Sequence, residues 1–162
     1  MNDQTALAVP KDRQDVTVHL SDGGVLEGTI FLEYSQAERT LLQKVTAFLE
    51  AGNTFFPLRL TEGGATEFIN KKNVRNVELA YSADAEKDSL ALSLMYQVEV
   101  TAIFANGSAI SGALLAEVPL EKARLSDCLN LPNRFLSVKV DSKICYINKS
   151  ALQKVVYPEK KA

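Results

Sequence analysis

The side chains that could do chemistry are few in this sequence of 162 residues. His19 is its single histidine, and the two cysteines, Cys128 and Cys145, have neither CxxC spacing nor histidine partners. Zinc sites and activated nucleophiles need several such groups brought together. P-loop, GxGxxG and GxSxG motifs are also absent from the sequence. We therefore expect no catalytic, metal-binding or cofactor-binding residues, and we interpret the protein as non-enzymatic.

The histidine, the cysteines and several aromatic residues have structural interpretations instead. His19 alternates with Val18 and Leu20, so we expect it to point outward from a strand at the surface. Two cysteines do not make a disulfide framework, and free cysteines are often small buried apolar groups. Phenylalanines and tyrosines that could stack on bases fall at core-like positions, namely Phe55, Phe68, Phe135 and Tyr146.

Polar and basic residues in two late turns are the candidates for contact with nucleic acid. They are Asn70, Lys71, Lys72, Asn148 and Lys149, with Arg134 and Lys154 as further cations. Lysine and arginine could neutralise phosphates. However, the formal net charge is −2, and nucleic-acid-binding domains usually carry a basic footprint. Solvated turns are the favoured interpretation, and RNA binding through the Asn-Lys turns is the alternative.

The elements that carry these turns recur as an internal repeat. The offset between matching segments shrinks along the chain from 84 to 80 and then to 78 residues. Their order and their apolar positions agree, which favours duplication of one unit. The matching pairs are Val16–Gly28 with Val100–Gly112, Asn53–Phe55 with Asn133–Phe135, and Phe68–Lys71 with Tyr146–Lys149.

Each unit is predicted to have the order strand, strand, helix, strand, strand, strand. Asp22-Gly23 and Asn106-Gly107 predict tight hairpins, of type I′ for Asp-Gly, and Gly28 within the returning strand predicts a bend. A helix is predicted from the apolar spacing between Leu41 and Leu49. Its expected capping box uses Ser35 and Glu38.

This pattern divides the chain into two units with a linker. We expect a flexible tail at 1–12, a first unit at 13–80, a linker at 81–95, a second unit at 96–158 and a short tail at 159–162. Each unit has about 65 residues, which is marginal for an independent core. The two units are therefore expected to pack together or to share a partner strand.

The hairpin VTVHLSDGGVLEGTI resembles the first sequence segment of Sm-like and Hfq-like barrels. The endings FINKKNVRNVEL and YINKSALQKVVY resemble their second segment. The resemblance implies a mainly β, α+β protein of two tandem, strongly bent, five-stranded SH3-like barrels. Here each barrel carries a helix between its second and third strands, whereas Sm proteins carry theirs before the first strand. The late turns also lack the Arg-Gly or Lys-His pair of that family, so the resemblance supports the fold more than RNA binding.

Composition narrows the class of function further. No apolar run reaches the roughly 18 residues that span a bilayer, and the first 15 residues lack the pattern of a secretory signal. We therefore expect a cytoplasmic protein without membrane insertion. The favoured function is a protein-interaction or scaffold module that binds a protein partner or itself, because tandem small barrels expose strand edges.

Overall fold

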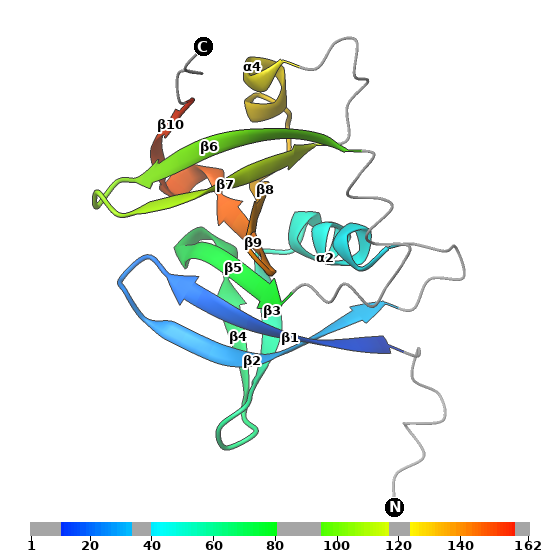
Figure 1. Cartoon of the computed structure of the whole chain (residues 1–162). Helices are drawn as coiled ribbons and strands as arrows, with labels where there is room; N and C mark the ends of the chain where they lie inside the picture. Colours follow the sequence, from blue (N-terminus) through cyan, green and yellow to red (C-terminus); the bar gives the residue numbers. More distant parts are fainter. Residues whose placement is uncertain (1–10, 34–39, 81–94, 117–123, 158–162) are drawn as a thin grey trace, which may run out of the picture.

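The computed structural model places all of its described strands in one antiparallel sheet (Figure 1). It describes residues 11–33, 40–80, 95–116 and 124–157. The first unit comprises β1 (Lys11–Leu20), β2 (Val25–Glu33), α2 (Leu41–Glu50), β3 (Phe55–Leu60), β4 (Thr66–Asn70), the 3₁₀ turn η1 (Lys71–Asn73) and β5 (Val74–Ala80). The second unit comprises β6 (Tyr96–Phe104), β7 (Ala109–Ala116), α4 (Leu125–Leu129), β8 (Phe135–Val140), β9 (Lys143–Asn148), η3 (Lys149–Ala151) and β10 (Leu152–Val156).

The prediction of a mainly β protein is confirmed, and the two units join in one open sheet of ten strands. The strand order is β10-β6-β7-β8-β9-β5-β1-β2-β3-β4. Each unit keeps its five strands together, and the junction is the pairing of β5 with β9. This junction gives the last strand of the first unit a partner instead of leaving its backbone groups unpaired at an edge.

Strand registers in the two units are related by the same offsets as the sequence. Val16 faces Gly28 in the first unit, and Val100 faces Gly112 in the second. The irregular pairing of β1 with β5 also recurs between β6 and β10, where Leu152 faces Phe104 as Val74 faces Leu20. The units therefore share their pairing as well as their strand order.

The first hairpin of each unit differs from the type I′ turn predicted for it. Positive φ occurs at Gly23 (94°) and at Gly107 (89°), but not at the residues that precede them. A type I′ turn needs positive φ at both central positions. The Leu20 N–H donates to the Gly24 carbonyl, and the Phe104 N–H donates to the Ser108 carbonyl. Each hydrogen bond closes a loop of three residues, the last of which is the left-handed glycine. Asp22 Oδ1 accepts a hydrogen bond from the Gly24 N–H, and Asn106 Oδ1 accepts one from the Ser108 N–H.

Gly28 and Gly112 let a neighbouring strand approach closely. A Cβ atom on Gly28 would lie 2.4 Å from the Arg59 carbonyl oxygen, and one on Gly112 would lie 2.4 Å from that of Lys139. Real Cβ atoms essentially never come this close to another atom. Glycine is therefore required where β2 meets β3 and where β7 meets β8.

Helix α2 covers the first unit's core with one apolar face. Its buried residues are Leu42, Val45 and Leu49. The N-cap is Thr40, whose side chain accepts from the Gln43 N–H while the Gln43 side chain accepts from the Thr40 N–H. The expected capping box of Ser35 and Glu38 lies outside the described residues. The last turn ends at Glu50, which becomes part of the contact between the units.

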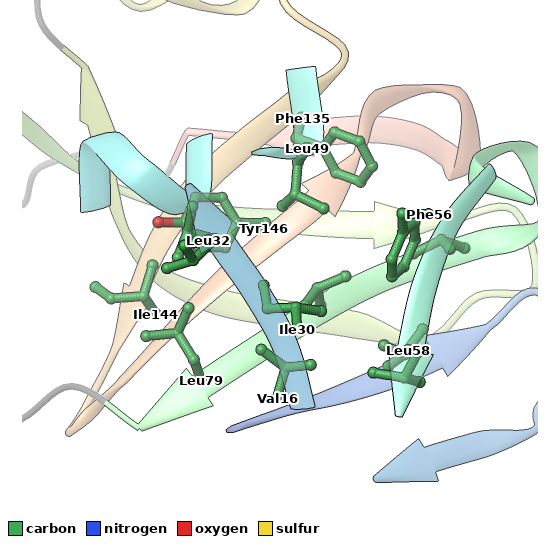
Figure 2. Close-up of a cluster of buried hydrophobic side chains, with 14 of the residues drawn as sticks. Val16, Ile30, Leu32, Leu49, Phe56, Leu58, Leu79, Phe135, Ile144 and Tyr146 are labelled. Carbon is green, nitrogen blue, oxygen red and sulfur yellow. The ribbon is translucent and has the colours of Figure 1, made fainter. Parts of the chain in front are cut away.

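The core of the first unit includes side chains from the second. Leu115, Phe135, Ile144 and Tyr146 belong to the same buried cluster as the apolar residues of β1, β2, α2, β3 and β5. Figure 2 shows Phe135, Ile144 and Tyr146 beside Leu32, Leu49 and Leu79. A second cluster fills the other unit, around Phe104, Leu114 and Val138. The expectation that the units pack together agrees with this shared core.

Some of the expected unit boundaries fall within the described residues. Strand β1 begins at Lys11, which pairs with Glu33, so the strand includes residues 11 and 12, the last two of the expected tail. The expected linker at 81–95 lies outside the described residues except for Met95. Residues 1–10 and the tail at 159–162 also lie outside them.

Candidate functional site

The contact between the two units is a strand pair supported by side chains on both of its faces. Asn76 faces Ile147, Val77 faces Tyr146 and Glu78 faces Cys145 along the β5–β9 register. On one face of this pair, Tyr146 is 1% exposed and its hydroxyl donates to the Leu42 carbonyl of α2 over 3.4 Å. Apolar burial and backbone pairing therefore act together at this contact, which we call the seam.

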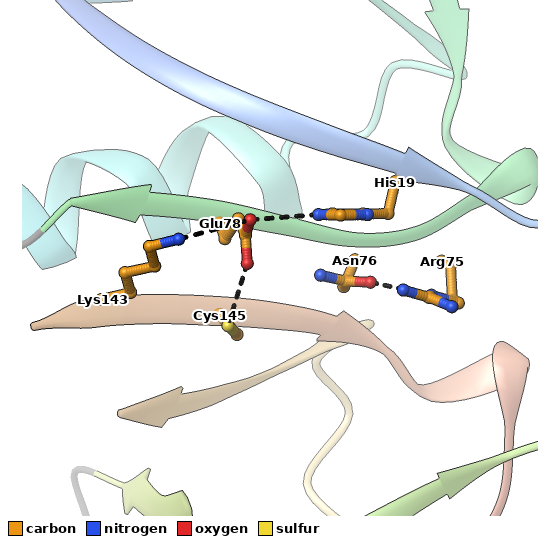
Figure 3. Close-up of polar contacts among 6 residues, drawn as sticks. All are labelled: His19, Arg75, Asn76, Glu78, Lys143 and Cys145. Atoms are coloured by element: carbon orange, nitrogen blue, oxygen red, sulfur yellow. Dashed lines mark hydrogen bonds and ion pairs between the residues drawn. The ribbon is translucent and has the colours of Figure 1, made fainter. Parts of the chain in front are cut away.

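Polar residues gather around Glu78 on the opposite face of the seam (Figure 3). One Glu78 oxygen lies 3.1 Å from His19 Nε2 and 3.9 Å from Lys143 Nζ. The other oxygen lies 3.8 Å from Cys145 Sγ. His19 is thus half-buried and paired with Glu78, where the sequence predicted a surface residue.

The cluster contains side-chain types that occur in catalytic groups, but the pKa of its thiol is shifted in the wrong direction for a nucleophile. Burial, followed by the charge of Glu78 and its hydrogen bond, raises the pKa of the Cys145 thiol to about 11. A reactive cysteine needs a lowered pKa, because the thiolate is the nucleophile. Cys145 is therefore held as a neutral thiol that donates toward Glu78.

A second set of contacts joins the ends of the units near α2. The Glu50 carboxylate accepts hydrogen bonds from the backbone N–H groups of Arg134 and Phe135 at 2.8–2.9 Å. The Asn148 amide donates to the carbonyls of Val74 at 2.8 Å and of Lys71 at 3.3 Å. Asn148 is buried, so these bonds satisfy donors that water could not reach.

The five candidate residues come from two turns that are far apart in sequence, and all five lie around one cavity. Its volume is about 330 Å³, and it lies where η1 of the first unit meets η3 of the second. Arg134 joins them there, whereas Lys154 is not part of its lining. The lining consists of Thr54, Asn70, Lys71, Lys72, Arg134, Phe135, Asn148, Lys149 and Ser150.

The two equivalent lysines of this cavity already bind protein acceptors. Lys71 is buried, and its Nζ donates to the Ala51 carbonyl and to Asn53 Oδ1, both at 2.7 Å. Lys149 Nζ donates in the same way to the Leu131 carbonyl at 2.6 Å and to Asn133 Oδ1 at 2.8 Å. Each ammonium therefore fixes the chain that follows the helix of its own unit.

Burial and nearby charges shift the pKa of both lysines. Burial, and then the nearby Arg134 charge, lowers the pKa of Lys71, while Glu50 raises it in part. Burial likewise lowers the pKa of Lys149, again opposed by Glu50. Lys72 is exposed, and so is Arg134. These two cations are the more accessible groups for an anionic ligand.

The free edges of the sheet form a second candidate region. Strands β4 and β10 are the terminal strands of the sheet, so each has a partner on one side within the described chain. Exposed apolar residues lie beside both edges: Phe55 and Phe68 at one end, Val156 and Tyr157 at the other. The sequence predicted core positions for Phe55, Phe68, Phe135 and Tyr146. That prediction was right for the last two and wrong for the first two.

An apolar cavity of about 490 Å³ lies between α2 and the second unit. Leu42 and Thr46 line it from the helix, and Leu114, Cys128 and Leu136 line it from the other side. Among the described residues that line it, most are apolar and none carries a charged side chain. Met95 and Ala116 also line it and adjoin stretches outside the described residues.

Sequence reasoning missed Glu50 and Glu78, which hold the seam. Neither residue belongs to a local sequence pattern. Arg134, which Glu50 contacts, lies 84 residues further along the chain, and Cys145, which Glu78 contacts, lies 67 residues further along. The equivalence of Phe55 with Phe135 was a usable signal for the edges. It predicts the same environment for both, but Phe135 is buried and Phe55 is 50% exposed.

Neither a family model, nor a curated protein, nor a solved structure matches this chain at a significant level. Within the described ranges, His, Cys, Asp and Glu side chains form no group of three or more that could hold a metal ion. In the same ranges no helix is long and apolar enough to cross a membrane.

Proposed function

We propose that this protein is a non-enzymatic interaction or scaffold module of the cytoplasm that binds polypeptides by strand addition at β4 and β10. In this proposal each unit is a strongly bent, five-stranded small barrel of the Sm-like kind, with its helix between the second and third strands. The 5-1-2-3-4 strand order that both units share supports this description. The observation that carries the function is the pair of terminal strands flanked by exposed phenylalanine, valine and tyrosine.

Strand addition explains these features better than a ligand pocket does. An edge strand presents unpaired N–H and C=O groups, and an added strand supplies main-chain bonds and side-chain pockets. Phe68 is 67% exposed on β4 although it lies in the middle of that strand. A large exposed apolar side chain at a sheet edge favours association, since an added strand would cover it.

Selection from a phage-displayed library of random peptides tests the function. We expect it to return extended, β-prone apolar peptides that bind the wild-type protein. Their binding should fall at least tenfold for Phe68→Lys or for Val156→Lys, depending on the edge that each peptide uses. Val25→Lys is the matched control, because Val25 is 55% exposed but lies at the β1–β2 hairpin. Peptides that bind both edge variants as tightly as the wild type would contradict the proposal.

RNA binding at the cavity between η1 and η3 is the second candidate function. The convergence of Lys72 and Arg134 with the two Asn-Lys turns favours it. Against it, Lys71 and Lys149 are already bonded to protein oxygens, and Glu50 adds negative charge beside the cavity. Mobility shifts with total cellular RNA at two salt concentrations test it. Salt-sensitive binding that is lost in a Lys72→Ala/Arg134→Ala variant, but kept in Lys154→Ala, would establish this function.

A further inference from the structure

We propose that the outer face of β1, β2 and β3 binds a sugar phosphate between Arg13 and Arg59. This site goes beyond the proposed function, and it shares no lining residue with the cavity between η1 and η3. Its volume is about 600 Å³, within the range of roughly 300–1,000 Å³ that is usual for ligand pockets. The described residues that line it are Arg13, Gln14, Asp15, Thr29, Phe31, Arg59 and Ala80.

The strand register brings both arginines to one face of the sheet. Arg13 faces Phe31 across the β1–β2 pair, and Thr29 faces Arg59 across the β2–β3 pair. Side chains that face each other, and those two positions apart on one strand, lie on the same face. Ile30, which lies between Thr29 and Phe31, belongs to the core and is 1% exposed. The two cations therefore lie outside the core, on the strands that flank Phe31.

The two guanidinium groups share one aromatic ring and keep their hydrogen-bond donors available. The Cζ atoms of Arg13 and Arg59 each lie 5.8 Å from the centroid of the Phe31 ring. A guanidinium has five N–H donors, and in the described part of the chain neither group makes a hydrogen bond or an ion pair. Guanidinium groups fit phosphate oxygens through pairs of parallel hydrogen bonds. The ring thus positions two cations toward one doubly charged phosphate.

Arg75 shows the structural alternative for an arginine beside an aromatic ring. Its Cζ lies 4.8 Å from the centroid of the Phe104 ring. Its Nε donates to Asn76 Oδ1 at 3.0 Å, and its Nη1 donates to Ser108 Oγ of the second unit at 3.4 Å. Arg75 therefore connects protein groups, whereas the two arginines beside Phe31 leave their donors to a ligand.

The second unit does not repeat this site. Gln97 stands in place of the first arginine and faces Leu115, which is buried in the shared core. Lys139 stands in place of the second arginine, and its Nζ donates to the Asp141 carbonyl at 3.0 Å. Residues that the fold itself requires, such as the glycines of β2 and β7, recur in both units. The arginine pair is not among them, which favours a ligand-binding role.

Asp15 determines the chemistry of the rest of the ligand. Its Oδ1 accepts a hydrogen bond from the Thr29 hydroxyl at 2.7 Å, and its other oxygen is an acceptor for a donor on the ligand. Its negative charge opposes a second phosphate at this position. A single phosphate monoester on a body that carries hydroxyl groups satisfies both conditions. A sugar phosphate therefore fits the cavity better than a nucleic-acid strand does.

Calorimetric titration of the full chain tests the site. The probes are glucose 6-phosphate, fructose 6-phosphate and ribose 5-phosphate, with glucose and inorganic phosphate as partial ligands. At least one sugar phosphate should bind more tightly than either partial ligand. Arg13→Gln and Arg59→Gln should each weaken that binding about tenfold or more, because hydrogen bonds to a charged group are lost. Both side chains are exposed, so the fold should persist.

Two further substitutions separate the contributions of the ring and of the carboxylate. Phe31→Leu removes the cation–π contacts alone and should weaken binding about two- to fivefold. Asp15→Asn keeps an oxygen that accepts from Thr29 but removes the charge. Sugar-phosphate affinity should then fall relative to the affinity for inorganic phosphate, which should stay equal or rise. An equal rise of both affinities would show that Asp15 does not bind the sugar and would overturn the proposal.

Controls place the binding on this face of the molecule. Arg75→Gln removes another arginine that lies beside a ring, and Lys72→Ala/Arg134→Ala removes the exposed cations of the cavity between η1 and η3. Both should bind the sugar phosphate as the wild type does, and circular dichroism confirms that each variant is folded. Loss of binding in Lys72→Ala/Arg134→Ala, but not in Arg13→Gln, would overturn the proposal.

The choice of ligand has its own contrary results. The proposal is rejected if none of the three sugar phosphates binds, or if inorganic phosphate binds as tightly as the best of them. A phosphoserine peptide or a nucleotide that binds more tightly than every sugar phosphate would reject the sugar as the carrier of the phosphate.

Discussion

Lys71 and Lys149 show how one residue type can act as a structural clamp in both units. Each ammonium joins a backbone carbonyl after the helix to the asparagine that precedes β3 or β8. Charged donors of this kind form stronger bonds than neutral ones. Because Lys71 lies in a polar turn, its side chain was expected to be exposed. The sequence could not show that its ammonium donates to the Ala51 carbonyl, 20 residues earlier. The turn was predictable and the function of its lysine was not.

Replacing Lys71 with methionine should destabilise the protein. The change keeps most of the side-chain volume but leaves the Ala51 carbonyl and Asn53 Oδ1 without their donor. We expect the free energy of unfolding to fall by about 1–3 kcal/mol, the usual cost of a buried polar group left unsatisfied. Urea denaturation followed by circular dichroism measures it. Lys72→Met is the control, and an equal loss in both variants would show that the clamp adds nothing.

Cys145 should make the stability of the protein fall at alkaline pH. Its thiol ionises near pH 9.0 when unfolded and near pH 11 when folded. Below pH 9.0 the thiol is neutral in both states. Above it the unfolded state loses the proton first, so the folded state loses stability as the pH rises towards 11. The lowered pKa values of Lys71 and Lys149 act in the opposite direction, but they are common to wild type and variant.

The contribution of Cys145 can be separated by comparison with Cys145→Val. Unfolding free energies of both proteins are measured below pH 9.0 and near pH 11. The difference between them should shift in favour of the variant as the pH rises. A difference that is independent of pH would contradict the elevated thiol pKa.

At the scale of elements, the strands were predictable because their signals are local. Alternating apolar residues and turn glycines lie within short stretches of sequence. The predicted helix from Leu41 to Leu49 corresponds to α2, which ends one residue later. The pairing of β5 with β9 was not predictable, because nothing within either strand names its partner. The pairing depends on which edge of each unit meets the other unit when both lie in one sheet.

Gly28 and Gly112 should tolerate alanine poorly and to a similar degree. In both places the new Cβ would lie 2.4 Å from a backbone oxygen, so a strand would have to move. We expect Gly28→Ala and Gly112→Ala each to cost about 1–3 kcal/mol of unfolding free energy, as overpacking usually does. Gly52→Ala is the control, since a Cβ there would meet nothing within 4 Å. Thermal unfolding compares the three variants, and a neutral Gly28→Ala would contradict the close approach of β3.

At the scale of the whole molecule, the seam determines whether the units can fold separately. The first core contains Leu115, Phe135, Ile144 and Tyr146 from the second unit, and Glu50 caps the start of β8 in return. A first unit without these side chains would expose the apolar surface of α2 and β5. We therefore expect the chain to unfold in one cooperative transition.

The last prediction concerns a single side chain of that seam. Tyr146→Ala removes a buried ring from the first unit's core although the residue belongs to β9 of the second. Large-to-small changes of buried aromatic residues usually cost about 3–5 kcal/mol. Because the units share this core, thiol labelling of Cys128, which lies in the other cluster, should accelerate together with the loss of circular dichroism. If Cys128 stayed protected at denaturant concentrations where the first unit had already unfolded, the units would be independent. The seam would then be a surface contact between two domains and not part of a common core.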